Sequence, residues 1–558
     1  MRFAGFTLAL AGIFAGSALA QTPTVGGLLN NYSYTLPGLP NYGIAEGSIF
    51  VIYGTNFSSA NTPLQSPPPP TLNGVTINVT VNGTTTHPLF YYLYPTQIAA
   101  VLPSATPVGT GAITVTTSAG TSAAFPIQVV ASAFGLLTSN NGSGPAQGYD
   151  ASIDASNQYI LFGFSEAANP GDILELWGTG LGPVANDATL VQVSSPPQVY
   201  IGGVAADVSY AGRSSYTGLD EIFIKVPSGV TGCYVSVVVQ TGNYVSNFGT
   251  VPVAATGRTC TDASNPITSA ILDGLTESGS LSAGFISISQ LTEPGITVGG
   301  VTVGGSTIDT SSASFAKITA SQFNAGAFAS ALGFTSIGSC YVDTFTTSSA
   351  TTTSAPLGFQ FVPLNAGPDI DINGPDGVLA MPFQTLDNLD TYSSPLAGGS
   401  FIPAAGGSFT FSGTGGPDVG AFTTPAIQIA PAVTWSNAAT ISTVTRSSGL
   451  TVNWTGGQTG AYVGITGVSL TGVTTNASSY LAGLFTCRVP ASAGTFTVPP
   501  AVLLSLPPSS TTSAGGTTIP LGFLLLSDAA APVSFSAPNL NVGIVEASVE
   551  NILFVTYK

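Results

Sequence analysis

The sequence predicts an all-β protein built of several β-sandwiches. Short runs that alternate apolar and polar residues, such as 75–81, 113–116 and 450–454, predict strands with one buried face. Asn-Gly, Gly-Gly and Pro-Ser turns separate these runs at intervals of about 8–12 residues, which is typical of sandwiches and barrels. The first half of the chain also repeats itself, which predicts tandem domains.

Residues 1–20 have the pattern of a signal peptide. Arg2 provides a positive start, an apolar run follows, and Ala-Leu-Ala precedes Gln21 as a cleavage site with small residues. The apolar run is shorter than the ~20 residues that span a bilayer, and no later run is long enough to form a transmembrane span. We therefore expect a bacterial protein that is secreted, and either released or held at the cell surface.

The repeat defines two domains of similar size. Residues 47–57, GSIFVIYGTNF, recur 124 positions later as GDILELWGTGL. At the same offset, Gln-Ile at 97–98 matches Glu-Ile at 221–222, and Pro-Ser at 103–104 recurs at 227–228. These matches predict one sandwich over residues 26–131 and a second over residues 132–256.

The motifs of this repeat resemble the IPT/TIG immunoglobulin-like domain. A strand that ends in Tyr-Gly-Thr or Trp-Gly-Thr, the run Tyr-Pro-Thr-Gln-Ile and a closing hairpin carry the resemblance. The segments at Pro170, Gly178, Ile201 and Gly232 are more closely similar to an uncharacterised tandem domain of secreted acidobacterial proteins. The resemblance implies two tandem immunoglobulin-like β-sandwiches, and it implies no biochemical role.

The second half continues as β structure without a clear repeat. It is loosely similar to other secreted acidobacterial β proteins, through segments such as Gly-Pro-Asp-Val-Gly and Trp-Thr-Gly-Gly. We expect a β-rich domain over residues 257–363 and a C-terminal β-sandwich region over residues 364–558. The predicted fold is thus all-β, with tandem immunoglobulin-like β-sandwiches followed by one or two further β-sandwich domains.

The charge of the chain excludes one class of partner. The 558 residues carry 25 acidic and 8 basic side chains, a net charge of −17, with a mean hydropathy of +0.42. So few cations cannot neutralise a phosphate backbone, so we expect no nucleic-acid partner. His87 is the one histidine, and a catalytic triad or a multi-histidine metal site would need it. Its place before Pro88 and a predicted strand favours a structural role.

The four cysteines predict disulfides, because an exported chain meets an oxidising compartment. Cys233, Cys260, Cys340 and Cys487 form no Cys-x-x-Cys pair and allow three complete pairings. Two successive predicted strands lie between Cys233 and Cys260, which favours a bridge there worth roughly 3–4 kcal/mol. Cys340 and Cys487 would then form the second bridge, and this pairing stays open.

One acidic segment has part of the spacing of a calcium loop. Asp369, Asp371 and Asn373 follow the pattern Asp-x-Asp-x-Asn-Gly, and Asp376 offers a further carboxylate. An EF-hand also needs an acid at position 12, which is Ala380. Isoleucines alternate with the acids, so the favoured interpretation is a strand with a solvated acidic face, and a calcium site is the alternative. No other cofactor is expected.

The aromatic residues offer either core packing or a binding surface. Tyr91, Tyr92 and Tyr94 cluster before a turn, and alternation places Tyr92 and Tyr94 on one face and Tyr91 on the other. Trp177 and Trp454 lie on predicted strands. Exposed rings stack on sugar faces, whereas buried rings fill the core. The pattern favours the core for these side chains.

No catalytic constellation can be assigned from the sequence. We expect a non-enzymatic, exported β-sandwich protein that acts in surface adhesion by binding a glycan or a cell-surface protein. Self-association into an extracellular structure is an alternative, because strand edges with few charges have little protection against pairing. A carbohydrate-active enzyme whose carboxylates are not located is another.

Overall fold

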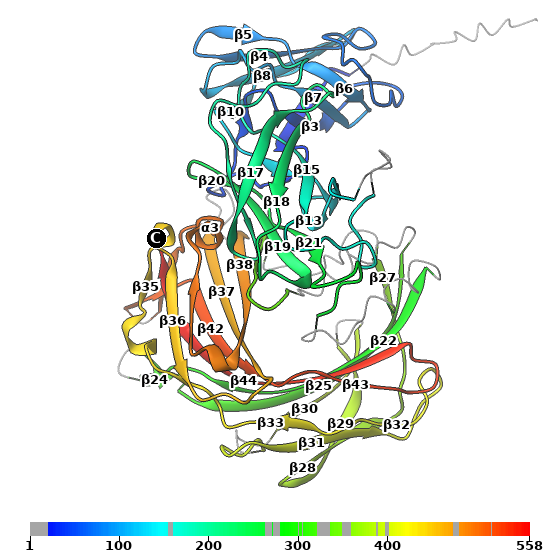
Figure 1. The fold of residues 1–558 in the computed structure, drawn as a ribbon, viewed down its shortest axis with the longest axis vertical. Coiled ribbons are helices and arrows are strands. Elements are labelled where there is room, and N and C mark those ends of the chain that lie inside the picture. Colours follow the sequence, from blue (N-terminus) through cyan, green and yellow to red (C-terminus); the bar gives the residue numbers. More distant parts are fainter. Residues whose placement is uncertain are drawn as a thin grey trace, which may run out of the picture.

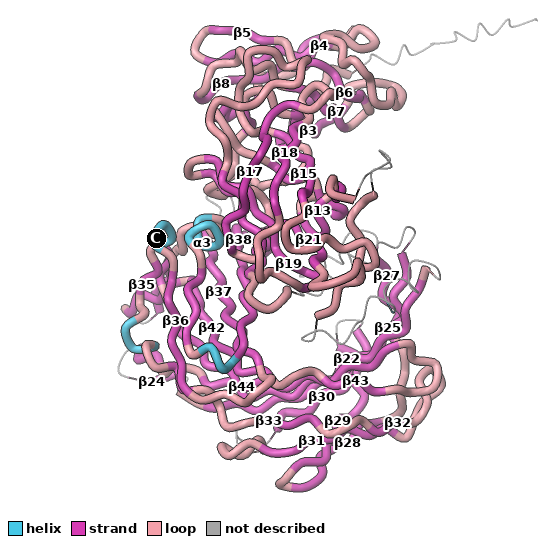
Figure 2. Tube along the Cα trace, viewed as in Figure 1, coloured by secondary structure: helices cyan, strands magenta, loops and turns pink. Residues whose placement is uncertain are grey.

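The computed structural model describes residues 21–153, 160–262, 271, 279–298, 301–303, 305–320, 335–348, 359–386, 389–396, 401–472, 479–514 and 516–558. The predicted signal peptide lies outside this range. Three bodies follow one another along the long axis of the molecule, in chain order (Figure 1). Strands dominate all three, and the helical turns are short (Figure 2). The all-β fold class is confirmed.

The first domain is a sandwich of two sheets. One sheet has the order β1 (Thr24–Asn30), β3 (Ile49–Thr55), β7 (Gln97–Val101), β6 (Leu89–Leu93). The other has the order β2 (Ile44–Ala45), β10 (Phe125–Val130), β8 (Gly109–Thr117), β4 (Thr76–Val81), β5 (Thr84–Thr86), with β9 (Gly120–Thr121) beside β8. Alternation along β4 buries Ile77, Val79 and Val81 between the sheets and leaves the intervening polar residues outside.

The strands of the second domain form one continuous hydrogen-bonded series. The order is β11 (Gly135–Leu136), β15 (Ile173–Thr179), β18 (Asp220–Lys225), β17 (Val204–Arg213), β16 (Gln198–Ile201), β19 (Gly232–Thr241), β21 (Gly249–Val253), β13 (Ser143–Ala146), β12 (Thr138–Asn140). The long strand β17 links the two halves of this series, because it pairs with β18 on one side and with β16 on the other. β14 (Gly148–Asp150) pairs with β15, and β20 (Tyr244–Val245) pairs with β19. Its buried residues form a core separate from that of the first domain.

The third body is built around a 15-stranded curved sheet. Its order is β26 (Cys340–Ser348), β38 (Ser479–Pro490), β37 (Tyr462–Gly472), β42 (Gly522–Ala529), β44 (Val542–Phe554), β22 (Ser280–Thr292), β25 (Thr307–Ala320), β30 (Leu389–Leu396), β29 (Gly377–Leu386), β28 (Asp369–Gly374), β31 (Gly407–Gly413), β32 (Phe422–Thr423). Three more strands pair at its sides: β27 (Phe359–Pro363), β33 (Ile427–Ile429) and β43 (Val533–Phe535).

Smaller elements cover part of this sheet. They are β23 (Ile296–Val298) with β24 (Val301–Val303), β34 (Thr434–Trp435) with β36 (Leu450–Thr455) and β39 (Thr495–Val498), β35 (Thr443–Val444) with β45 (Thr556–Tyr557), β40 (Thr511–Ala514) with β41 (Thr517–Pro520), the helix α3 (Pro500–Leu504), and the 3₁₀ turns η2 (Ala438–Thr440), η3 (Arg446–Ser448) and η4 (Ala491–Ala493). Trp454 of β36 is 2% exposed and packs in one core with residues of β37, β38 and β42. This end of the third body is therefore a sandwich as well.

The long sheet crosses the expected boundary at residues 363 and 364. β22 pairs in parallel with β44, and β26 pairs with β38, so strands from both sides of that boundary share one sheet. The division expected there does not separate two structural units. The strands of the first domain end with β10 at Val130, and the last strand of the second domain, β21, ends at Val253.

Two disulfides reinforce the second domain and the third body. Cys233 at the start of β19 is bonded to Cys260, across 27 residues. Cys340 of β26 is bonded to Cys487, its register partner on β38, across 147 residues. In the described part of the chain, none of the helices has both the length and the apolar character needed to cross a bilayer.

Candidate binding surface

Tyrosines gather on the outer face of the first domain because β6 contains a bulge. Phe90 of β6 is fully buried in the core. The register with β7 then shifts between Phe90 and Tyr92. The extra residue places both Tyr91 and Tyr92 against the outer cluster around Ile49 and Val101. Regular alternation had predicted opposite faces for these two tyrosines, and a bulge of this kind has no signature in the local sequence.

Tyr92 and Tyr94 form a stacked pair next to an amide. Their ring centroids are 4.7 Å apart, with an interplanar angle of 24°. Gln97 Nε2 donates a hydrogen bond of 2.7 Å to Tyr92 Oη, and Tyr53 is the register partner of Gln97 on β3. Burial and the neighbouring phenols of Tyr34, Tyr53 and Tyr94 raise the pKa of Tyr92 above its ordinary value. These rings are therefore close neighbours, and we call Tyr34, Tyr53, Tyr92, Tyr94 and Gln97 the tyrosine surface.

All five residues of the tyrosine surface are half-buried, so each presents part of its side chain to solvent. The sequence pattern favoured the core for Tyr92 and Tyr94, and the structure places them outside it. Trp454 does lie in a core, as expected. Trp177 is half-buried on the outer face of the second domain, beside Tyr149.

The loop that carries Tyr34 is tied to the second domain. Asn30 Oδ1 accepts the backbone N–H groups of Tyr32 and Ser33 at 2.9 and 3.1 Å. The amide nitrogen of Asn30 donates to the carbonyl oxygens of Ala133 and Thr179 at 3.2 and 3.3 Å. One buried side chain therefore fixes the loop to both domains, which orders one edge of the tyrosine surface.

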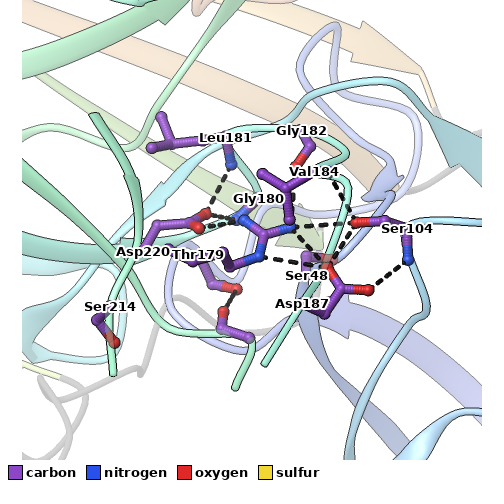
Figure 3. A network of polar contacts seen from close by, with 12 residues as sticks. Ser48, Ser104, Thr179, Gly180, Leu181, Gly182, Val184, Asp187, Ser214 and Asp220 are labelled. Atoms are coloured by element: carbon purple, nitrogen blue, oxygen red, sulfur yellow. Dashed lines mark hydrogen bonds and ion pairs between the residues drawn. The ribbon is translucent and has the colours of Figure 1, made fainter. Parts of the chain in front are cut away.

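A buried polar cluster joins the same two domains (Figure 3). Ser104 of the first domain donates from its hydroxyl and its backbone N–H to Asp187, at 2.6 and 2.9 Å. Asp187 lies 3.3 Å from the guanidinium of Arg213, which also pairs with Asp220. Asp220 accepts the backbone N–H groups of Gly180 and Leu181 at 2.7 and 2.8 Å. Each carboxylate is paired with the guanidinium and also accepts hydrogen bonds, so these contacts hold the two domains in a defined arrangement.

The tyrosine surface lies on an almost uncharged domain. Residues 24–131 contain no lysine or arginine, one carboxylate, Glu46, and the imidazole of His87. Any ligand of this domain therefore meets phenol, hydroxyl, amide and backbone groups rather than fixed charges. Such a surface offers a charged ligand no nearby Lys or Arg to pair with, which favours neutral ligands.

The second domain has different chemistry at the equivalent positions. The 124-residue offset matches Tyr53 with Trp177 and Gln97 with Glu221. Trp177 Nε1 donates to Glu175 Oε1 at 2.6 Å. Burial, together with the charge and hydrogen bond of Glu175, raises the pKa of Glu221 to about 7. The aromatic position of the repeat is thus retained, whereas its neutral amide is replaced by a carboxyl group.

The four residues of the calcium alternative do not converge. Asp369, Asp371 and Asn373 share the outer side of β28, and Ile370 and Ile372 between them are fully buried. Asp376 lies in the turn between β28 and β29, at the far end of the hairpin from Asp369. In the described ranges, no group of three histidine, cysteine, aspartate or glutamate side chains is placed to hold a metal ion.

Comparisons with known proteins give no family. No family model matches the chain, and no curated protein matches it. Among solved structures, similarity was found to the plexin A4 extracellular region, with 15% identity over 44% of this chain and 19% of that chain and a TM-score of 0.17. A second is SGBP-B of the Bacteroides ovatus mixed-linkage glucan utilization locus in complex with a heptasaccharide, with 13% identity, 38% and 45% coverage and a TM-score of 0.19.

A third is domains 5–6 of the S-layer protein SbsC, with 14% identity over 42% of this chain and 100% of that fragment, and a TM-score of 0.14. The chain spans less than half the length of the first two proteins. Likenesses with such low TM-scores carry no argument about function.

Proposed function

We propose that this is an exported bacterial surface protein that binds a neutral polysaccharide on the tyrosine surface of its first domain. The observation that carries the proposal is the stacked pair Tyr92 and Tyr94 beside Gln97, half-buried on a domain with almost no charge. The signal-peptide pattern and the two disulfides support a place outside the cytoplasm.

The chemistry of the tyrosine surface suits a sugar polymer. The apolar faces of pyranose rings pack against aromatic rings, and the phenol and amide groups exchange hydrogen bonds with sugar hydroxyls. The rings lose little freedom on binding, because packing and the hydrogen bond from Gln97 already order them. A neutral polymer also avoids the cost of removing charged groups from water.

The experiment uses residues 21–558 and a panel of insoluble neutral polysaccharides. Depletion of the protein from solution measures binding, and release of reducing ends in the same tubes measures hydrolysis. Depletion without release is the expected result. Tyr92→Ala and Tyr94→Ala should each weaken binding at least tenfold, which corresponds to about 1.4 kcal/mol.

The matched control is Tyr480→Ala, which removes a half-buried tyrosine from β38 of the third body. This variant should bind like the wild type. Depletion should also persist in high salt, because no fixed charge takes part. Release of reducing ends would make the protein an enzyme, and equal binding by all three variants would remove the tyrosine surface from the proposal.

A further inference from the structure

A cavity lies where the three bodies meet. It has a volume of about 190 Å³, and each body contributes part of its wall. Its lining includes Tyr34 and Asn41 of the first domain, Asn141 and Phe248 of the second, and Asp343 of the third. In Figure 1 the labels β20, α3 and β38 mark this region, and α3 contacts both β20 and β26. We call this cavity the junction pocket.

Asp343 is the one charged side chain among the residues that line the junction pocket. Asp343 is exposed to solvent at the pocket, and its Oδ1 accepts the backbone N–H of the adjacent Thr344 at 2.8 Å. No cation of the described chain forms an ion pair with it. Its carboxylate, on the wall of a polar cavity, therefore has unused acceptor capacity.

The other walls supply amide groups and apolar surface. Asn41 Oδ1 accepts the backbone N–H of Val245 at 3.2 Å, which leaves its amide nitrogen as a donor. Asn141, with φ of 46°, is exposed at the pocket. Tyr34, Leu39 and Phe248 are among the apolar residues of the lining. Hydrogen-bond donors and acceptors thus surround a carboxylate and lie beside an aromatic ring.

This chemistry discriminates among ligand classes. An anion would meet the charge of Asp343 with no cation to offset it. A calcium ion takes six to eight oxygen ligands and needs more than one carboxylate for tight binding. The volume is also below the ~300–1,000 Å³ of sites for drug-sized molecules. A small neutral molecule with several hydroxyl groups satisfies all three conditions.

We propose that the junction pocket is a second binding site, which takes a single neutral sugar unit whose adjacent hydroxyls donate to Asp343. This site goes beyond the proposed function, because it is separate from the polymer-binding pair Tyr92 and Tyr94 and does not depend on it. Its walls come from three bodies, so an occupied pocket also stabilises their arrangement.

The test titrates residues 21–558 with the methyl glycosides of glucose, galactose and mannose by calorimetry and by thermal unfolding. At least one glycoside should bind with a Kd in the millimolar range and raise the unfolding temperature. Asp343→Asn should weaken that binding at least tenfold. The matched control Asp371→Asn, on the outer face of β28, should bind like the wild type.

Tyr92→Ala distinguishes the two sites, and Tyr34 is left intact because it contributes to both. This variant should lose polysaccharide binding and keep glycoside binding, whereas Asp343→Asn should do the reverse. If Asp343→Asn does not fold, Asn141→Ala at the exposed rim replaces it and should also weaken the glycoside. Absence of binding by the wild type at ~100 mM glycoside overturns the proposal. So does glycoside binding that is lost in Tyr92→Ala but unchanged in the pocket variants.

Discussion

Arg213 and Asp220 form an ion pair from which solvent is fully excluded, since both side chains are 0% exposed. The guanidinium also donates to the carbonyl oxygen of Gly182 at 2.9 Å, and it reaches Asp187 at the border with the first domain. Buried charges of this kind are tolerated only when each is paired and hydrogen-bonded. The pair therefore fixes the strand ends of the second domain against which the first domain packs.

Removal of one partner of this ion pair should strongly lower the free energy of unfolding. Asp220→Ala leaves the Arg213 charge buried and uncompensated, and it also removes the acceptor of two backbone N–H groups. We expect the free energy of unfolding to fall by about 3–5 kcal/mol. Denaturant unfolding measures it. Asp187→Ala, at a side chain that is 21% exposed, should cost only about 1 kcal/mol, and equal losses would contradict the burial argument.

Ionisation of Glu221 should make the stability of the folded protein depend on pH. Its pKa is raised in the folded state to about 7, from an ordinary value of 4.5. The folded protein therefore binds more protons than the unfolded chain between these values, and this residue makes stability fall as pH rises from about 4.5 to 7. Glu221→Gln should remove that fall and stabilise the protein at pH 8 by about 1 kcal/mol, because solvent screens a half-exposed group.

The measurement for Glu221 is denaturant unfolding at pH 5 and pH 8. The difference between wild type and Glu221→Gln should be larger at pH 8. Glu166→Gln, at an exposed acid of the same domain, is the control and should follow the wild type at both pH values. A wild-type stability that rises over this interval while the variant is flat would contradict the assigned direction.

The two disulfides should differ in their effect on stability. In the chain-entropy picture the bridge that closes 147 residues is worth about 5 kcal/mol, and the bridge that closes 27 residues about 3.5 kcal/mol. Replacement of Cys340 and Cys487 by serine should therefore destabilise more than replacement of Cys233 and Cys260. Denaturant unfolding of the two double variants tests the order, which would be reversed if local strain rather than loop length dominated.

Local patterns in the sequence predicted part of this fold and left the rest open. Alternation of apolar residues identified strands such as β4. The 124-residue repeat predicted two tandem domains, because its matching segments lie in similarly short windows. The parallel pairing of Ala283 with Val542 has no such signal, since the register joins strands that are 259 residues apart. A long sheet therefore replaced the division expected at residue 363.

The candidate sites were less accessible to sequence reasoning than the fold. Tyr91 and Tyr92 share a face because β6 contains a bulge, and the backbone pairing of β6 with β7 determines where that bulge lies. The junction pocket joins Asn41, Asn141 and Asp343, which no sequence spacing relates. In contrast, the near absence of charge in residues 24–131 could be read directly, and it supports the choice of a neutral ligand.

The repeat supplies its own control for the border between the first two domains. Gly47 and Gly171 occupy equivalent positions, with φ of 75° and 98°. A methyl group on Gly47 would collide with the guanidinium of Arg213 and approach the hydroxyl of Ser104, whereas one on Gly171 would meet no atom within 4 Å. Both alanine variants carry the cost of a left-handed backbone, about 1–2 kcal/mol.

Gly47→Ala should therefore lose about 1–3 kcal/mol more than Gly171→Ala, because a well-packed and fully bonded side chain must move. Denaturant unfolding of the two variants gives this difference directly, since the backbone term is common to both. In an Arg213→Met background the difference should shrink, because the guanidinium that causes the collision is gone. If the difference in unfolding free energy between the two variants stayed the same in this background, its cause would lie in the first domain alone. The contacts of Arg213 would then not be what fixes the two domains against each other.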